Sequence, residues 1–182
     1  KTPEELDSMK KAGLDMLYLG IETGSDILLK KVTKGATAKT IIKSCKKAKD
    51  AGFTLSCMVI LGIGGSKYSS ENARETAKVI SEVKPDYVGA LTLYLENGIK
   101  DEFLTKFNEE FIRISDSEAI DELEELVSGI DVNDKVVFRA NHGSNAYNVA
   151  GTFPEDKQAM LDKINWMKEH PEVVRPQGLR GF

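Results

Sequence analysis

The sequence predicts an α/β fold: a partial, TIM-like (βα) barrel of about three parallel βα units with a C-terminal helical extension. Amphipathic helix patterns alternate with short apolar runs up to residue 98, and acidic helical segments follow. Short connections between such elements favour parallel strands joined by right-handed crossovers. Three strands are too few to close a barrel. We therefore expect a barrel half over residues 1–98 and a mostly helical extension over residues 99–182.

The first helix and strand are marked by local signals. Thr2 and Glu5 flank Pro3 in the pattern of a capping box, which predicts a helix start. Gly13 ends that helix. The apolar run 14–21 lies between glycine-containing turns and predicts a buried strand.

The second unit begins at Thr37, which opens an amphipathic helix closed by Gly52. The apolar stripe of this helix consists of Ile41, Ile42, Cys45 and Ala48. The strand predicted over residues 54–61 is nearly all apolar, so we expect it to be covered on both faces.

The third unit and the extension follow. Ser69 or Ser70 is expected to cap a helix that stops before Pro85, and residues 87–94 form the third strand.

Residues 101–128 hold ten acidic and two basic residues. Within them Ser115 begins another capping box, and the helix behind it points Ile120, Leu123, Leu126 and Val127 inward. Residues 136–140 predict one more strand, and Pro154 starts a last helix. Residues 171–182 are expected to form a ragged tail.

Composition limits the function. Charged residues make up 30% of the 182 residues, hydrophobic residues 41%, and the net charge is −4. These values are typical of a globular protein. No apolar window approaches the roughly 20 residues of a membrane span, and the first residues do not predict a signal peptide. We expect a cytoplasmic protein that binds neither membrane nor nucleic acid.

Cysteine usage argues against metal chemistry on this chain. Cys45 lies on the apolar face of a predicted helix and Cys57 inside a predicted strand, so both are interpreted as small buried hydrophobes. Two cysteines cannot make a disulfide scaffold, an iron–sulfur site or a four-ligand zinc site. We expect no metal here.

Ligands of parallel α/β folds bind at the carboxyl ends of the strands, and Glu22 falls at such an end. Its carboxylate can accept hydrogen bonds from an ammonium group or from ribose hydroxyls. In the alternative interpretation, Ser25 or Asp26 caps the next helix and Glu22 is a solvated turn residue.

Two further loops also fall at strand ends. The amides of the glycine-rich loop 62–67 suit an adenine or a carboxylate, although the spacing is neither that of a Walker A loop nor GxGxxG. The loop 138–145 is rich in hydrogen-bonding side chains. It includes His142, which is more often a structural residue than a catalyst in such a place.

Together these motifs resemble those of radical S-adenosylmethionine (radical SAM) enzymes. Residues 18–26 and 33–35 resemble the family's fourth strand and its loop, where the pattern is Gly-Ile/Val-Glu-Ser-Gly followed by Lys/Arg-Gly. Residues 58–65 resemble the fifth-strand motif GxIxGxxE, with Met58 in place of its first glycine and Gly65 in place of its glutamate.

The resemblance extends over nearly the whole chain. Residues 93–98 are similar to the end of the sixth strand, and residues 141–145 and 151–157 are similar to the tail of a branch of small radical SAM proteins. It implies that Asn141 and His142 close the barrel mouth or meet substrate. No catalytic residue is assigned.

The resemblance also implies a cofactor site. Glu22 and Gly24 would belong to the fourth-strand motif, with Glu22 at the amino or ribose part of S-adenosylmethionine. Lys34 would face the cofactor's carboxylate, which suits an ammonium group on a flexible stem. Gly62 and Ile63 would lie against the adenine.

One departure from the family is large. The cluster loop CxxxCxxC and the second-strand motif, which precede the matching part in such enzymes, are absent, and the chain begins at Lys1 without an initiator methionine. We therefore expect the C-terminal portion of a radical SAM protein. The intact parent would use a 4Fe–4S cluster to cleave S-adenosylmethionine reductively and drive radical chemistry on an unknown substrate. This chain alone would be inert and hold neither cofactor.

Two other functions stay open: a non-catalytic binding or scaffolding half-barrel, and an iron-independent (βα)-barrel lyase or isomerase with Glu22 and His142 as acid and base. Because the first strands are missing, the sheet should have an unprotected edge. We expect dimerisation or strand exchange through the strand that holds Tyr18.

Overall fold

The computed structural model of the protein describes residues 1–95 and 97–180. They form one five-stranded sheet in the order β1-β2-β3-β4-β5. Its strands are β1 (Met16–Glu22), β2 (Thr54–Leu61), β3 (Tyr87–Thr92), β4 (Val136–Ala140) and β5 (Val149–Phe153). Strands β1 to β4 pair in parallel and β5 pairs antiparallel to β4.

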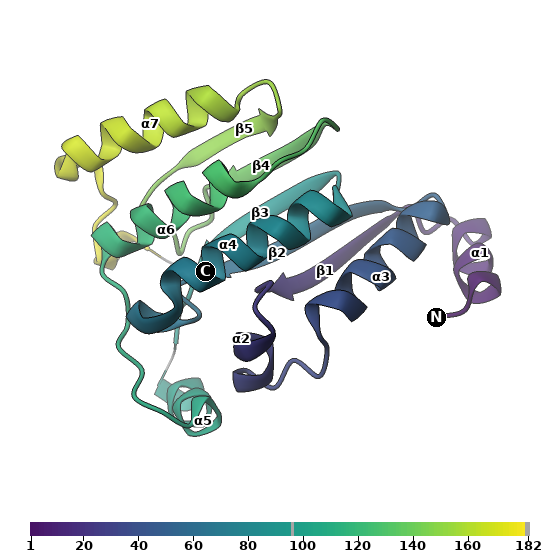
Figure 1. The fold of residues 1–182 in the computed structure, drawn as a ribbon, viewed down its shortest axis with the longest axis horizontal. Helices are drawn as coiled ribbons and strands as arrows, with labels where there is room; N and C mark the ends of the chain where they lie inside the picture. Colours follow the sequence, from purple (N-terminus) through teal and green to yellow (C-terminus); the bar gives the residue numbers. More distant parts are fainter. Residues whose placement is uncertain (96, 181–182) are drawn as a thin grey trace.

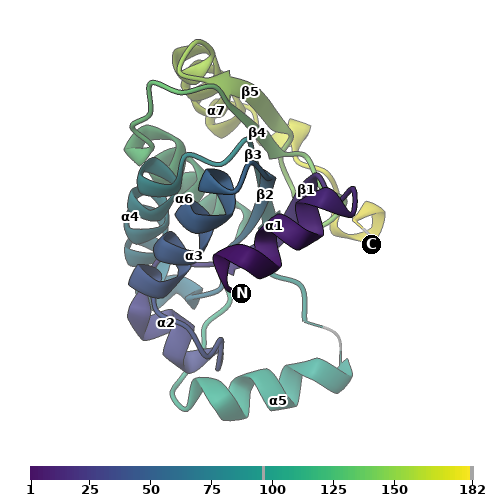
Figure 2. The ribbon, with the colours of Figure 1, turned by 90° about the vertical axis from the view of Figure 1, so that its right-hand side faces the viewer.

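Helices connect the strands. They are α1 (Pro3–Lys11), α2 (Asp26–Lys31), α3 (Ala38–Asp50), α4 (Gly65–Val83), α5 (Asn97–Phe107), α6 (Asp116–Gly129) and α7 (Lys157–Glu169), with 3₁₀ turns η1 (Pro171–Val173) and η2 (Gln177–Leu179). Figures 1 and 2 show α3, α4, α6 and α7 together on one face of the sheet. The sheet is not closed, which confirms the predicted partial βα barrel.

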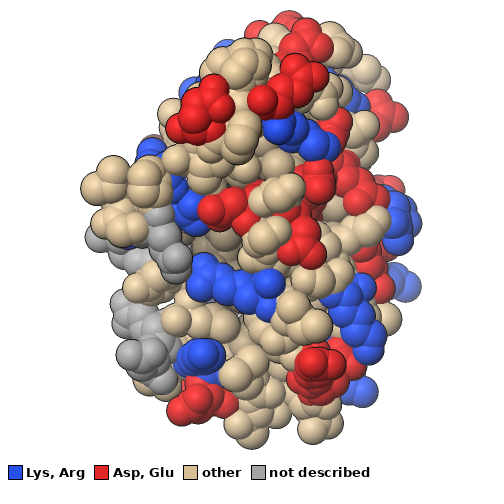
Figure 3. Space-filling view, turned by 90° about the vertical axis from the view of Figure 1, so that its left-hand side faces the viewer, with Lys and Arg blue, Asp and Glu red and all other residues tan. Residues whose placement is uncertain are grey.

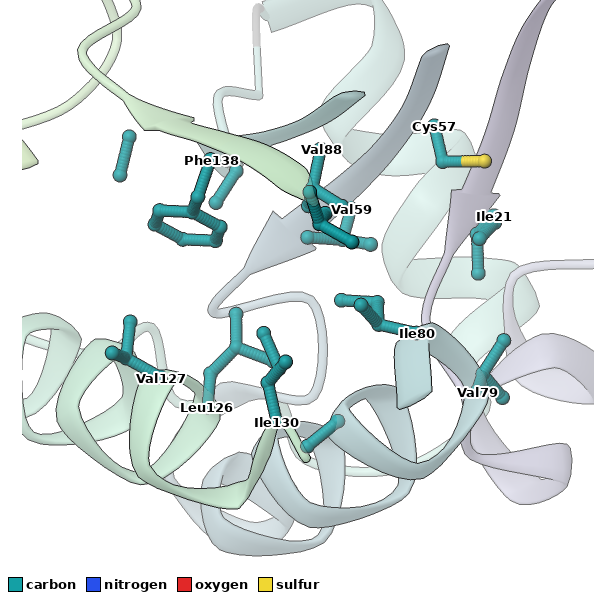
Figure 4. Packing of buried hydrophobic residues seen from close by; sticks show 14 of the residues in the cluster. Ile21, Cys57, Val59, Val79, Ile80, Val88, Leu126, Val127, Ile130 and Phe138 are labelled. Carbon is teal, nitrogen blue, oxygen red and sulfur yellow. The ribbon is translucent and has the colours of Figure 1, made fainter. Parts of the chain in front are cut away.

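The core lies between the sheet and its helix layer (Figure 4). Ile80 from α4 and Leu126 from α6 meet Val59, Val88 and Phe138 from the strands, all of them at most 1% exposed. Burying each such side chain contributes about 1.5–3 kcal/mol before the entropy of ordering the chain is subtracted. This layer therefore fixes the positions of the strand ends.

The prediction that β2 is covered on both faces is wrong. Its side chains alternate between buried and partly exposed, with Leu55, Cys57, Val59 and Leu61 buried. The alternation follows from the open sheet, because the helix layer covers only one of its faces. The side chains of Ser56 and Met58 point to the other face.

Several predicted boundaries are confirmed. Thr2, Thr37 and Ser115 each cap a helix, with a capping box at each start. The predicted cap of α4 at Ser69 or Ser70 is wrong, because this helix already begins at Gly65 and continues through a kink at Tyr68.

The last helix also differs from the prediction. Helix α7 begins at Lys157 rather than Pro154, because residues 154–156 form a turn in which the Asp156 amide donates to the Thr152 carbonyl at 2.8 Å. Strand β5 was not predicted.

The tail is docked rather than ragged over residues 171–180. The guanidinium of Arg180 makes two hydrogen bonds of 2.7 Å with the carboxylate of Asp116. The amide of Arg175 donates to the carbonyl of Ala146 at 2.9 Å. These contacts hold the tail against the start of α6 and the loop that follows β4.

Strand β1 forms one edge of the sheet, as predicted. It pairs with β2 alone within the described ranges, and Tyr18 on it is 71% exposed. Dimerisation through this edge stays a prediction, as does the domain boundary at residue 98. Strands β4 and β5, which follow that boundary, extend the same sheet. No helix in the described part of the chain is long and apolar enough to cross a membrane.

Candidate functional site

The carboxyl end of β1 carries an ion pair. Glu22, the last residue of β1, accepts a hydrogen bond from the ammonium of Lys34, with 2.9 Å between Oε1 and Nζ. Their side chains are 26% and 31% exposed. The structure thus brings together two of the predicted site residues, and Glu22 is not a freely solvated turn residue.

The backbone around Glu22 directs this ion pair. Glu22 has a φ of 66°, a left-handed conformation that costs about 1–3 kcal/mol in a residue with a side chain. The pairing with β2 shifts register between Gly20 and Glu22. A Cβ on Gly20 would lie 2.2 Å from Oε1 of Glu22. Glycine at position 20 therefore leaves the room that the Glu22 carboxylate occupies next to Lys34.

The residues that follow β1 hold the strand end against α4. Ser25 caps α2 by accepting a hydrogen bond from the amide of Leu28. The amide of Gly24 donates to Oγ1 of Thr76 at 2.9 Å, and a Cβ on Gly24 would lie 2.1 Å from the carbonyl oxygen of Glu75. Gly24 is thus needed for close packing on α4, and its part in cofactor binding stays a prediction.

The glycine-rich loop after β2 lies under a segment of the same chain. The amide of Ser66 donates to the carbonyl of Ile112 at 2.9 Å. A Cβ on Gly62 would lie 2.8 Å from the side chain of Ile114, and one on Gly65 would lie 2.6 Å from the carbonyl oxygen of Ile112. These glycines therefore make room for residues 111–114, which we name the covering segment.

Ile63 is buried beneath the same cover. It is 3% exposed and packs with Leu28 and Phe107. Phe103 and Phe111 join this cluster from α5 and from the covering segment. Contact of Gly62 and Ile63 with an adenine stays a prediction.

Sequence reasoning missed a buried carboxylate next to this loop. Glu122 on α6 is 2% exposed. Its Oε1 accepts hydrogen bonds from the amide of Gly62 at 2.8 Å and from Nδ2 of Asn72 at 2.7 Å, and its Oε2 accepts one from the hydroxyl of Ser69. Burial raises the pKa of the Glu122 carboxyl, and these hydrogen bonds oppose the rise. The sequence feature that could have revealed this residue is a glutamate inside the apolar stripe of α6.

The loop after β4 is anchored by its middle. Asn145 is buried: its Nδ2 donates to the carbonyl of Ala90 at 2.8 Å and its Oδ1 accepts the amide of Thr92 at 2.8 Å. Asn141 and His142 are exposed, and Nδ1 of His142 accepts the amide of Ser144 at 3.1 Å. Their contact with substrate stays a prediction.

Glu22 and His142 are not neighbours. Strands β1 and β4 lie three positions apart in the sheet, or roughly 14 Å at the usual spacing between strands. The acid and base of the proposed lyase or isomerase are therefore not brought together at one place on the strand ends.

The comparison with protein families matches residues 1–80 to the Radical SAM superfamily. The match covers 80 of the 182 residues and supports the resemblance to radical SAM enzymes. The matched region runs from α1 into α4 and includes Glu22, Lys34 and the glycine-rich loop. No protein in the curated set matches the chain significantly.

Intact radical SAM proteins use S-adenosylmethionine and a 4Fe–4S cluster, and the residues here do not fit the cluster. Cys45 and Cys57 are both buried in the core. The hydrogen bond with Cys45 and burial hold the pKa of the Cys57 thiol above its usual value, which disfavours a thiolate ligand. Within the described ranges, no three His, Cys, Asp or Glu side chains lie close enough together to hold a metal ion.

Proposed function

We propose that this chain supplies the later strands of a radical SAM barrel and that Glu22 and Lys34 hold the amino-acid end of S-adenosylmethionine. The observation that carries the proposal is the ion pair at the carboxyl end of β1, inside the region that matches the superfamily. The cluster ligands and the substrate site would come from outside this chain. Alone, the chain would not cleave S-adenosylmethionine.

The chemistry of the pair supports this assignment. The amino-acid end of S-adenosylmethionine carries an ammonium and a carboxylate. The ammonium is opposite in charge to Glu22, and the carboxylate is opposite in charge to Lys34. A partly exposed ion pair contributes only about 0–1 kcal/mol, so a zwitterion can open it at little cost. Each side chain then exchanges its partner for a charge on the ligand, and no charge is left unpaired.

The glycine-rich loop would take part only after a local rearrangement. The Gly62 amide donates to Glu122 rather than to a ligand, and Ile114 lies over Gly62. Adenine contact at Gly62 and Ile63 would require the covering segment to shift. We therefore expect weak, millimolar binding by this chain, with no cofactor retained during purification.

Equilibrium dialysis tests the proposal with two ligands, S-adenosylmethionine and 5′-methylthioadenosine, which lacks the amino-acid end. Glu22→Gln and Lys34→Met should each weaken S-adenosylmethionine binding by about tenfold, the loss of one charge-assisted contact. Binding of 5′-methylthioadenosine should not change.

Asp15→Asn provides a matched control for this experiment. Asp15 pairs with Lys10 at 2.6 Å before the opposite end of β1, and its replacement should leave both affinities unchanged. The assignment would be contradicted if Asp15→Asn lost as much affinity for S-adenosylmethionine as the site variants, or if Glu22→Gln bound S-adenosylmethionine as the unaltered chain does. A chain that binds neither ligand would favour the non-catalytic scaffold, for which the open edge of β1 is the supporting feature.

A further inference from the structure

A cavity of about 360 Å³ opens at the carboxyl ends of β2 and β3, apart from the ion pair on β1. Leu61 and Leu93 line it from the strand ends, and Ile114 and Ala119 line it from the covering segment and α6. This volume lies in the range of small-molecule sites. These four side chains form the apolar part of the wall, which suits the body of a small organic molecule, and Thr92 and Ser115 add polar groups beside it.

Three charged side chains also line this cavity: Arg113, Asp116 and Arg180. Asp116 and Arg180 neutralise each other through their two 2.7 Å hydrogen bonds, and the Arg180 side chain is only 11% exposed. The guanidinium of Arg113 donates to the carbonyl of Leu93 at 3.4 Å, a long contact. Among the residues that the structure describes, Arg113 makes no further hydrogen bond or ion pair that would occupy its other donors. The three groups together carry one positive charge.

We propose that this cavity binds a small carboxylate, with Arg113 holding the carboxylate and the apolar walls holding the rest of the ligand. A guanidinium matches the two oxygens of a carboxylate. A phosphate dianion suits the site less well, because only one positive charge is unbalanced and Asp116 stands at the same wall. Gly62, which would meet the adenine only after the covering segment shifts, also lines this cavity. Arg113, Asp116 and Arg180 have no part in the proposed function, so the inference goes beyond it.

The C-terminal tail is part of the proposed site. Arg180 comes from the tail, which the amide of Arg175 anchors to Ala146. Removing the Arg180 guanidinium would free the Asp116 carboxylate beside the ligand and bring the local charge to zero. The tail therefore serves the site by neutralising Asp116.

Figure 3 shows the end of the molecule to which the parallel strands point. Acidic and basic side chains are interspersed across it and do not gather into one charged patch. A carboxylate would therefore be selected by the net charge of the side chains around Arg113 rather than by a broad positive surface. Binding should respond sharply to single changes at the cavity.

A matched series of ligands tests the charge requirement on the full chain. Benzoate, benzamide and benzylamine share one ring and differ in charge, and each is titrated into ¹⁵N-labelled protein while the amide spectrum is recorded. Benzoate should shift the amides of Leu93 and Ala119 and bind about tenfold more tightly than benzamide. Benzylamine should not bind. Equal affinity for benzoate and benzamide, or tighter binding of phenyl phosphate than of benzoate, would overturn the proposal.

Variants locate the site. Arg113→Met should abolish the preference for benzoate over benzamide, whereas Arg74→Met, which removes an exposed arginine paired with Glu125, should preserve it. Arg180→Met should weaken benzoate binding, and adding Asp116→Asn to it should restore the affinity. A preference that survives in Arg113→Met refutes the assignment. If that variant does not fold, 1 M NaCl added to the unaltered chain must reduce the preference, and a preference insensitive to salt overturns the proposal.

Discussion

Replacing Glu122 with leucine should destabilise the fold strongly, because a buried carboxylate accepts the hydrogen bonds that tie α4 and the glycine-rich loop to α6. In Glu122→Leu the amide of Gly62 and one N–H of Asn72 lose their acceptor. Each buried, unpaired donor costs about 1–3 kcal/mol. Losing the burial penalty of the carboxylate offsets part of this sum, so we expect a net loss of about 2–4 kcal/mol.

Glu122→Gln keeps a hydrogen-bond acceptor at this position and removes the negative charge, so it tests the two contributions separately. The amide oxygen of glutamine can replace Oε1 toward Gly62 and Asn72, and the hydroxyl of Ser69 can turn to accept. We expect a loss of at most about 1 kcal/mol from this variant.

The assay is urea unfolding followed by circular dichroism, with Glu125→Leu as the matched control. Glu125 is the neighbouring carboxylate on the exposed side of α6, and it accepts a hydrogen bond from Ser70 at 2.7 Å. Its loss should cost about 0–1 kcal/mol. If Glu122→Leu were no more destabilising than Glu125→Leu, the reasoning from buried donors would be refuted.

The pH dependence of the same comparison follows from the raised pKa of Glu122. A carboxyl whose pKa is higher in the folded state contributes stability that is present below its unfolded pKa and is lost as pH rises through the folded pKa. Glutamine does not titrate. The stability of the unaltered chain relative to Glu122→Gln should therefore fall as pH rises above the ordinary glutamate pKa of about 4, and a relative stability that rises with pH there would contradict the assigned direction.

Three further predictions concern other parts of the molecule. Glu109 lies between two lysines that lower its pKa to about 2, so Glu109→Gln should lower the urea midpoint at pH 7. This difference should shrink as pH falls toward 2, and a constant difference would argue against it. Tyr18→Lys on the open edge of β1 should turn a dimer into a monomer by light scattering, and an unaltered chain that is already monomeric at high concentration would count against edge pairing. Anaerobic reconstitution with iron and sulfide should yield no visible iron–sulfur absorbance, whereas a stoichiometric cluster on Cys45 and Cys57 would contradict the account.

The fold was predictable where the signals are local. The capping boxes at Thr2 and Ser115 and the helix start at Thr37 are confirmed because such caps depend on residues three apart in the chain. The antiparallel strand β5 was missed because Ala150 and Gly151 give its centre little β propensity. It is held mainly by its ladder with β4, which no pattern within residues 149–153 reveals.

The candidate site was predictable only in part, for the same reason. Glu22 and Lys34 are 12 residues apart and fall in one recognisable stretch of motif. Glu122 is 60 residues from Gly62, and nothing local says that its carboxylate reaches that loop. The glycines at 62 and 65 were interpreted as exposed toward a ligand, whereas the structure places the covering segment against them.

The central claim is that the ends of β1 and β2 hold S-adenosylmethionine, and an amide spectrum titrated with this ligand tests it most directly. The account predicts saturable shifts at Glu22, Lys34 and Gly62, with little change in α7 or β5 on the far side of the sheet. Saturable shifts confined to α7 and β5, or none at millimolar ligand, would contradict it.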